Sequence, residues 1–338
     1  MNAPIDIAPS TEAGSLGVFH LKRMWSAALA ERQGRSARRK GEVRLDKMVL
    51  SCLGLGLHQV LQQLYANAPS FEEFERWIVR TAGRPDRLSV ERANATLAGQ
   101  AHTEPVRQWL DAIDDSEPVL SPDDLAFWEA HGYVVLKDAV PAEASAEAAR
   151  VIWDHVGADP DAPDSWYGLK GKDTHGIMVE LIQHPALEAN RRSARIHKAF
   201  AQLWGSADLW ASADRCGFHP PQRPDWPFPG PDLHWDVDFD EPPAFCTQGI
   251  LYLTDTPPEQ GAFTLVPGFQ HRYSDWLRTL EPGVDPQKQD LHALGSKPIG
   301  GRAGDMVIWH HWLPHGSRPN LGSRPRMVQY INMLPGRG

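Results

Sequence analysis

Apolar residues recur with helical spacing in the first hundred residues of the chain. From Asp46 onward they stand three and four positions apart, which places them on one face of a helix. These positions are Leu50, Leu53, Leu57, Val60, Leu61 and Leu64. Shorter patterns of the same kind predict helices over residues 19–32 and 89–97. We therefore expect an all-helical N-terminal unit over residues 16–98.

A further helix in this unit is predicted from its first residues. Ser70 is followed three positions later by Glu73, which fits a capping box, where each side chain binds the backbone N–H of the other residue. The apolar positions that follow are Phe71, Phe74, Trp77 and Ile78, and Gly83 ends the pattern.

Polar segments flank and interrupt the helical unit. Residues 1–15 are rich in Pro, Ser, Thr and acidic side chains and predict a disordered lead, and residues 99–120 predict an acidic linker. A basic run within the unit contains Arg32, Arg35, Arg38, Arg39 and Lys40. A solvated loop is our first interpretation of this run. The alternative is a docking patch for an anionic handle on the substrate, such as a CoA or phosphopantetheine group.

After residue 120 the pattern changes, because helix signals now alternate with strand signals. Ser121 stands before Pro122 and two aspartates, which predicts the start of a helix that ends at Gly132. The elements expected next are a strand over 133–136, an alanine-rich helix from Pro141 to Gly157 and a helix over 194–203.

The last third of the chain is rich in strand-forming residues. The elements expected there are a buried strand over 246–254, a strand and turn over 261–268, a helix over 273–280, and an apolar strand after Gly304 that ends in a turn carrying His315. Residues 218–231 hold six prolines in fourteen positions and predict an ordered loop. Residues 281–298 predict a long loop that would serve as a lid.

Charge and cysteine content narrow the class of protein. The 338 residues include 34 basic and 43 acidic side chains, which argues against nucleic acid as a main partner because such a partner requires a basic face. Cys52, Cys216 and Cys246 are odd in number and widely spaced, so no disulfide framework is expected. We find neither a signal peptide nor an apolar run long enough to span a bilayer. These features predict a soluble, cytoplasmic protein.

His234 and Asp236 are the first candidate metal ligands. Residues two apart on a strand point to the same face, so this His-x-Asp pair can bind one ion. His315 supplies a third ligand, and two histidines with one carboxylate form the facial triad that binds non-haem Fe(II) and leaves positions open for a co-substrate and O2. Four neighbouring residues compete with this assignment, namely Asp238 and Asp240 for Asp236, and His310 and His311 for His315.

Arg326 is a candidate for binding the co-substrate. An oxygenase of this kind usually needs two electrons, and 2-oxoglutarate supplies them when a planar cation holds its distal carboxylate. Arg326 stands eleven residues after His315 and opens an alternating strand, with Val328 on the same face. Arg324 is the alternative.

Four motifs follow one another in this part of the chain. They are His234-Trp235-Asp236, the run from Glu259 to His271, Gly304-Asp305, and His315-Gly316-Ser317-Arg318-Pro319-Asn320 followed by Arg326. In this order and spacing, over about residues 121–334, they resemble the phytanoyl-CoA dioxygenase family of Fe(II)/2-oxoglutarate oxygenases.

The resemblance implies a fold and a set of site residues. The fold is mainly β with helices: residues 121–338 would form a double-stranded β-helix, the jelly-roll barrel of cupins, with the metal at its mouth. The His-Gly-Ser-x-Pro-Asn pattern favours His315 as the distal ligand, and Ser317 matches a position that helps to hold 2-oxoglutarate. Gln248, a polar residue in a buried strand, is another candidate for 2-oxoglutarate, and a structural hydrogen bond is an equal alternative.

The resemblance also implies an activity. It is the hydroxylation of an unactivated carbon in a small-molecule or carrier-attached biosynthetic intermediate, with succinate and CO2 released. Halogenation is disfavoured because related halogenases replace the carboxylate ligand with a small residue, and this chain retains Asp236. Candidate substrate contacts in an aromatic and basic loop are Trp166, Tyr167, Lys170 and Lys172, and a solvated loop is an equal interpretation of that segment.

Other functions and roles stay open at this point. A cupin-like isomerase or hydrolase would use the same three ligands without 2-oxoglutarate, and a non-catalytic barrel would carry the triad as a vestige. The helical unit would recognise a carrier, form a homodimer or cap the pocket, and its sequence does not choose among these roles.

Overall fold

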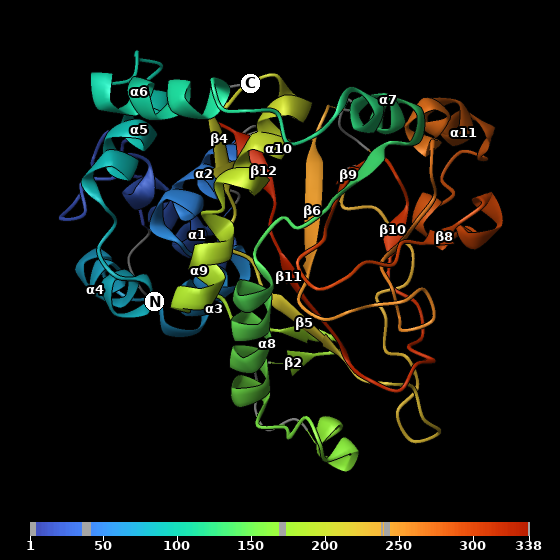
Figure 1. Cartoon of the computed structure of the whole chain (residues 1–338). Helices are drawn as coiled ribbons and strands as arrows, with labels where there is room; N and C mark the ends of the chain where they lie inside the picture. The colour runs from blue at the N-terminus through green and yellow to red at the C-terminus, as the bar shows by residue number, and fades with distance from the viewer. Residues whose placement is uncertain (1–4, 36–41, 169–173, 238, 240–243, 337–338) are drawn as a thin grey trace. The chain divides into compact units, whose positions relative to one another are not determined.

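The computed structural model describes residues 5–35, 42–168, 174–237, 239 and 244–336 (Figure 1). The chain divides into two compact units. The first comprises residues 1–117, 204–214 and 333–338, and the second comprises residues 118–203 and 215–332.

The first unit is mainly helical. Its helices are α1 (Leu21–Arg32), α2 (Glu42–Leu53), α3 (Leu57–Asn67), α4 (Phe71–Ala82), α5 (Arg87–Leu97) and α6 (Glu104–Asp114). It also contains two short antiparallel strands, β4 (Leu209–Ala211) and β12 (Met333–Pro335). The described elements within the predicted range 16–98 are all helices, and the two strands of this unit come from segments far along the chain.

The helical pattern that begins near Asp46 forms two helices instead of one. Helix α2 ends at Leu53 and α3 begins at Leu57. Gly54 between them has a φ of +64°, a left-handed conformation that glycine adopts readily and that ends a helix. The leucines of both helices nevertheless reach the same core, because the spacing of the apolar positions is kept across the break.

The capping box at the start of α4 is confirmed. The Ser70 hydroxyl accepts a hydrogen bond from the Glu73 backbone N–H, and the Glu73 carboxylate accepts one from the Ser70 N–H.

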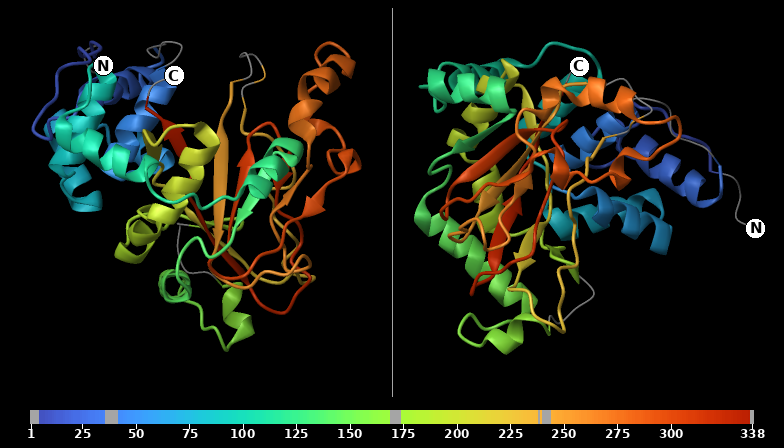
Figure 2. Two further views of the ribbon diagram at one scale, coloured as in Figure 1. Left: turned by 45° about the horizontal axis from the view of Figure 1, so that its top comes forward. Right: turned by 90° about the vertical axis from the view of Figure 1, so that its right-hand side faces the viewer.

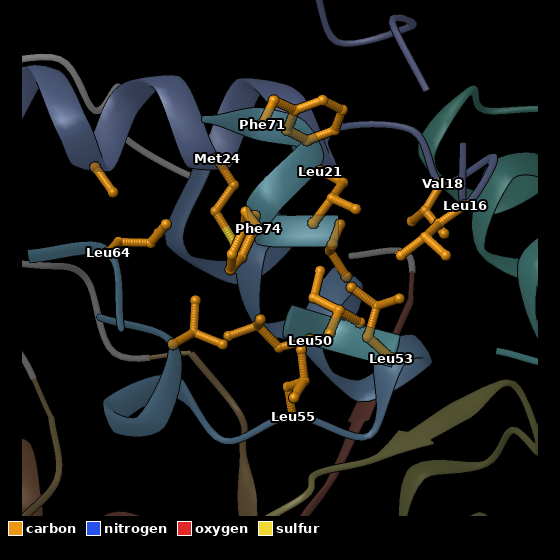
Figure 3. Packing of buried hydrophobic residues seen from close by; sticks show 14 of the residues in the cluster. Leu16, Val18, Leu21, Met24, Leu50, Leu53, Leu55, Leu64, Phe71 and Phe74 are labelled. Atoms are coloured by element: carbon orange, nitrogen blue, oxygen red, sulfur yellow. The ribbon is translucent and has the colours of Figure 1, made fainter. Parts of the chain in front are cut away.

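Apolar positions expected from the sequence form the core of this unit. The buried cluster includes Leu21, Met24, Leu50, Leu53, Leu64, Phe71 and Phe74, and Figure 3 shows these side chains packed together.

Three polar segments differ from what their composition predicts or lie outside the described residues. Residues 99–120, predicted as a linker, contain helix α6. At the end of the predicted disordered lead, the Ser15 hydroxyl donates to the buried carboxylate of Glu75 at 2.8 Å, and the N–H of Leu16, the residue after the lead, donates to the same carboxylate at 2.9 Å. Of the proposed basic docking patch, Arg35 donates to the Ile5 carbonyl, and Arg38, Arg39 and Lys40 lie outside the described residues.

The second unit begins with the helix and strand predicted for it. Ser121 and Asp124 form a capping box at the start of α7 (Pro122–His131), which ends at Gly132 with a left-handed φ of 72°. The other α-helices are α8 (Ala142–Val156), α9 (Pro185–Arg191), α10 (Ala194–Trp204), which runs to the boundary of the unit, and α11 (Tyr273–Thr279). Short 3-10 helices are η1 (Pro163–Trp166), η2 (Phe269–His271), η3 (Pro286–Lys288) and η4 (His292–Leu294).

Antiparallel strands form two sheets in the described part of this unit. Seven strands pair in the order β1-β9-β6-β11-β5-β3-β2: β1 (Tyr133–Leu136), β9 (Met306–His310), β6 (Thr247–Tyr252), β11 (Arg326–Tyr330), β5 (Cys216–His219), β3 (Met178–Val179) and β2 (Thr174–His175). Three more pair in the order β10 (His315–Gly316), β7 (Thr264–Leu265) and β8 (Lys297–Pro298). Strands β6, β11 and β5 lie side by side in Figure 1, and Figure 2 shows the same sheet from two other directions.

One face of the large sheet carries the core and several polar side chains. Paired residues of antiparallel strands share a face, so the register places Arg326 with His219, Val328 with Tyr252, and Gln248 with Trp309. A buried cluster joins this face to β7 of the smaller sheet, with Ile250, Tyr252, Leu265, Val307, Trp309 and Val328 among its members. The interior between the sheets therefore has polar groups at several levels.

Some boundaries in this unit differ from the sequence-based expectation. Phe218 and His219, assigned to a proline-rich loop, belong to β5, because the prolines begin only at Pro220. His315, expected in a turn, lies in β10. Helix α9 was not predicted, since its seven residues are too few to show a helical period. The predicted lid over 281–298 contains η3 and η4 and ends in β8.

The cysteines agree with the composition. Cys52, Cys216 and Cys246 are not joined in disulfides, and burial raises the pKa of Cys52 to about 12. In the described ranges, no helix combines the length and the apolar character needed to cross a membrane.

Candidate metal centre

Three side chains converge at one point of the second unit. One ligand atom from each of His234, Asp236 and His315 lies within 4.8 Å of the others, and no other such group occurs in the described part of the chain. The Asp236 carboxylate oxygens lie 3.7 Å from His234 Nε2 and 3.4 Å from His315 Nε2. Two ligands bound side by side to one ion at about 2.1 Å each would be about 3 Å apart. The three side chains therefore need to move little to bind one divalent ion.

Backbone carbonyls fix which nitrogen each histidine presents. His234 Nδ1 is 2.7 Å from the Asp232 carbonyl, and His315 Nδ1 is 3.0 Å from the Leu313 carbonyl. A carbonyl can only accept, so each Nδ1 carries the proton and each Nε2 presents its lone pair. Burial and the nearby His315 lower the pKa of His234, which keeps this imidazole neutral, as a metal ligand must be.

The backbone brings the two histidines together. The N–H of each donates to the carbonyl of the other at 2.9 Å, and His315 pairs on its other side with Leu265 of β7. His234 makes only this isolated bridge, and Asp236 lies beyond it outside any regular strand. The sequence-based reason for their proximity, two residues on one strand face, is therefore wrong in detail, although both side chains do reach the same point.

The Asp236 carboxylate is held in its ionised form. Burial alone would raise its pKa, but the neighbouring His315 ring and the Gln248 amide bring it well below its usual range. Gln248 Nε2 donates to Asp236 Oδ2 at 2.7 Å. Gln248 therefore orients a metal ligand, while its buried Oε1 has no hydrogen-bond partner among the described residues.

The competing ligands lie elsewhere or outside the described residues. His310 accepts a hydrogen bond from the Trp312 N–H through Nδ1, and burial lowers its pKa to about 3. His311 Nε2 is 2.6 Å from the Ala244 carbonyl. Asp238 and Asp240 lie outside the described residues.

Arg326 is a buried cation with no anionic partner in the part of the chain that the structure describes. Its side chain is 0% exposed, and one guanidinium nitrogen donates to the Gly261 carbonyl at 2.9 Å. The other two guanidinium nitrogens have no hydrogen-bond partner in the described part of the chain. A buried charge without a counter-ion costs several kcal/mol, so the site fits an anion that supplies the missing acceptors. Arg324, by contrast, is exposed and donates to the Pro160 carbonyl.

His219 was missed by the sequence analysis. It pairs with Arg326 in the sheet, is 0% exposed, and neither ring nitrogen has a hydrogen-bond partner among the residues described. Burial and the Arg326 charge lower its pKa to about 2, so the ring is neutral. Gly261, with a left-handed φ of +65°, leaves room for this ring, because a Cβ there would come within 2.7 Å of it. A lone histidine beside six prolines gave no signal of this role.

The cation and the metal ligands are joined by one short segment. Gly261 accepts from Arg326, and two residues later the Phe263 ring lies 6.1 Å from the His315 ring and 4.2 Å from the Trp309 ring. Phe263 and Trp309 both belong to the core between the sheets. Arg326 and the triad therefore border the same core between the two sheets.

The remaining predicted site residues differ in their surroundings. Ser317 is buried, and its backbone N–H donates to the Pro231 carbonyl at 3.0 Å. Trp166 is also buried, with its indole N–H donated to the Asp159 carbonyl. Tyr167 is half-buried, donates to the Pro221 carbonyl and carries the Arg223 guanidinium 3.6 Å above its ring. Lys170 and Lys172 lie outside the described residues.

Comparison with known proteins decides the family. A model of the family described as phytanoyl-CoA dioxygenase (PhyH) matches residues 128–328, more than half of the chain. The chain belongs to the phytanoyl-CoA dioxygenase family. The resemblance predicted from the motifs is thus confirmed, and with it the enzyme class, a dioxygenase that uses iron, 2-oxoglutarate and O2.

Individual relatives of this family member are distant. A Dictyostelium discoideum protein named as a phytanoyl-CoA dioxygenase is 22% identical over 261 residues, covering 62% of this chain and 74% of that protein. An ectoine dioxygenase of Nocardia farcinica is 25% identical over 295 residues, covering 79% and 88%. Among solved structures, the non-haem alpha-ketoglutarate-dependent carbocyclase SnoK from nogalamycin biosynthesis matches with a TM-score of 0.47 and 20% identity, covering 65% and 87%.

Proposed function

We propose that this family member hydroxylates an unactivated carbon of a small-molecule or carrier-attached intermediate, with Fe(II) held by His234, Asp236 and His315. The observation that carries the proposal is the pairing of this triad with a buried arginine, two of whose guanidinium nitrogens have no hydrogen-bond partner among the described residues. Two neutral imidazoles and one carboxylate suit Fe(II), and Arg326 suits the distal carboxylate of 2-oxoglutarate. The seven-stranded and three-stranded sheets would be the two walls of a double-stranded β-helix around this site.

Each residue of the candidate site has a defined task in this proposal. His234 and His315 present Nε2 because Asp232 and Leu313 bind their Nδ1–H groups. Gln248 holds Asp236 through one carboxylate oxygen, which limits how that ligand can rotate. Arg326, with neutral His219 beside it, and Ser317, two residues after His315, would bind and orient 2-oxoglutarate.

The cofactors supply the oxidising chemistry. Fe(II) and 2-oxoglutarate, when bound, would supply the oxidation of the substrate by O2, with one oxygen atom ending in succinate, the other in the hydroxyl group of the product, and CO2 released. The chain's own part is to position the carbon that reacts and to exclude water, through the apolar walls formed by residues such as Phe263 and Trp309.

The substrate is proposed only as a class. Tyr167 stays our candidate for a substrate contact, because its ring lies in a half-buried cluster with Arg223 and Trp226, and Trp226 lies beside His219. Trp166 is no longer favoured, since its ring packs on Trp153 and its only polar atom is already bonded.

Isotope labelling tests this proposal. The protein, Fe(II) and 2-oxoglutarate are incubated under 18O2 with extracts or compound sets, and succinate and substrates are followed by mass spectrometry. Hydroxylation predicts one 18O atom in succinate and one in a product. A product that loses two hydrogens without gaining oxygen would indicate desaturation or ring formation instead. A converted substrate without succinate would favour the 2-oxoglutarate-independent isomerase or hydrolase.

A further inference from the structure

Trp235, the residue between two metal ligands, has unusual backbone partners. It lies beyond the His234–His315 bridge and outside any regular strand, so no neighbouring strand binds its polar backbone groups. Both groups bind a single side chain. The Trp235 N–H donates to Gln287 Oε1 at 2.9 Å, and Gln287 Nε2 donates to the Trp235 carbonyl at 2.8 Å. The Gln287 amide thus replaces the pair of hydrogen bonds that a neighbouring strand would supply.

These two hydrogen bonds act on the peptide groups that join Trp235 to the metal ligands. The N–H of Trp235 belongs to the peptide group shared with His234, and its carbonyl belongs to the peptide group shared with Asp236. Because each peptide group is planar, fixing both of them limits the backbone rotations that aim the two ligand side chains. The indole of Trp235 is anchored separately, through its N–H to the Trp312 carbonyl at 2.8 Å.

Gln287 is itself held in place by its own segment. It lies in η3 (Pro286–Lys288), where its backbone N–H donates to the Asp285 carboxylate at 2.9 Å. The same segment makes a second contact near the metal ligands, because His292 Nε2 lies 2.8 Å from Asp232 Oδ1. Asp232 provides the carbonyl that binds His234 Nδ1. Residues 281–298, predicted as a lid, therefore bind the segment of residues 232–236 at two positions, Asp232 and Trp235.

We propose that Gln287 is a positioning residue of the metal centre, which holds His234 and Asp236 in metal-binding orientation through the backbone of Trp235. The inference rests on the proposed metal site of these two residues and His315. Loss of a residue that orients metal ligands typically weakens metal binding by about 10–100-fold. If Gln287 only stabilised its own loop, its loss would change thermal stability and leave metal affinity unaltered.

The chain offers a matched control in the same segment. Gln289 lies two residues away and is also half-buried, and its amide donates to the Asp285 carbonyl at 3.1 Å instead of to any of the described residues 232–236. Substituting methionine for either glutamine keeps the length of the side chain and removes its amide. Comparing Gln287→Met with Gln289→Met therefore separates loss of the Trp235 contacts from general damage to the segment.

The test measures Co(II) affinity and the visible Co(II) spectrum of the full-length protein, with thermal unfolding of the metal-free form alongside. We expect Gln287→Met to bind Co(II) about 10–100-fold more weakly, with an altered spectrum, and Gln289→Met to match the parent. Should Gln287→Met fold poorly, Gln287→Asn keeps an amide too short to reach both backbone groups and is expected to show the same loss.

Two outcomes separate this inference from the proposed function. Metal binding by either Gln287 variant within twofold of the parent, with an unchanged spectrum, would overturn the positioning role and leave the metal site intact. A parent protein that binds no metal would instead count against the proposed function itself.

Discussion

His234 and His315, eighty-one residues apart in the chain, each donate a backbone N–H to the carbonyl of the other, at 2.9 Å in both directions. This hydrogen-bonded pair places the two imidazole rings on the same side, with ring centroids 4.9 Å apart. Both donate Nδ1–H to a carbonyl two residues earlier, at Asp232 and Leu313. Backbone groups therefore fix the orientation of the two nitrogens that we propose as metal ligands.

Gly316 permits this close approach, and an added methyl group should disturb it. A Cβ at Gly316 would lie 2.3 Å from the Asp232 carbonyl oxygen and 3.0 Å from the Leu233 nitrogen. We expect Gly316→Ala to lower the free energy of unfolding by about 1–3 kcal/mol and to weaken metal binding, because the two ligand segments must separate. Urea unfolding and Co(II) titration measure both effects. Gly168→Ala, whose Cβ would meet no atom of the described residues within 4 Å, is the control. Parent-like values for Gly316→Ala would contradict this account of the pair.

Binding of 2-oxoglutarate should require the planar guanidinium group of Arg326 and not only its positive charge. Arg326→Lys keeps the positive charge but loses the planar pair of N–H donors, so we expect 2-oxoglutarate to bind roughly 10–100-fold more weakly, equivalent to about 1.5–3 kcal/mol for a charged hydrogen bond. Calorimetry with Co(II)-loaded protein measures the dissociation constant. Arg324→Lys changes an exposed residue bonded to the Pro160 carbonyl and should leave it unaltered. Equal losses in both variants would mean that Arg326 has no special place in the site.

His219 should make folding of the metal-free protein sensitive to acid. Its pKa is about 2 in the folded chain and about 6.5 when exposed, so the unfolded state binds the extra proton between these values. Stability from this group is complete above pH 6.5 and is lost as the pH falls below it, by up to about 1.4 kcal/mol per pH unit. Urea unfolding from pH 7 to pH 4 should give a shallower pH dependence for His219→Gln. An identical slope would show that His219 takes up a proton in the folded state.

The capping box at Ser70 offers a test in the helical unit. Ser70→Ala removes the acceptor for the Glu73 N–H, and we expect a loss of about 1 kcal/mol in the free energy of unfolding. Thr103 is the residue before α6, and its hydroxyl makes no capping hydrogen bond, so Thr103→Ala should cost less. Urea unfolding of both variants gives the comparison. A larger loss for Thr103→Ala would contradict the observed capping.

Local signals in the sequence predicted the elements that depend on nearby residues. Ser70 with Glu73 and Ser121 with Asp124 mark their helices through contacts three residues apart. His234, Asp236, His315 and Arg326 were chosen as candidate site residues because their residue types and order are typical of one chemistry, and the structure brings the first three together. The break at Gly54 was missed, since the apolar period continues across it although the backbone turns.

Contacts between distant segments could not be predicted. The surroundings of His219 depend on Arg326, which lies 107 positions later and pairs with it in an adjacent strand. Nothing near His219 in the sequence indicates this pairing. Gln287 binds Trp235 from a segment whose sequence indicates only a loop. Gln248 was considered as a partner of 2-oxoglutarate or as a structural residue, and its amide nitrogen binds the ligand Asp236.

The most direct test of the central claim is anaerobic addition of Fe(II) and then 2-oxoglutarate to the metal-free protein, while the weak visible charge-transfer band of the iron-bound co-substrate is recorded. The account predicts a band in the parent and in Arg324→Ala, loss of the band in Asp236→Ala, and a band in Arg326→Ala only at much higher 2-oxoglutarate concentration. Bound iron without a band in the parent, or a parent-like band in Asp236→Ala and Arg326→Ala, would contradict it.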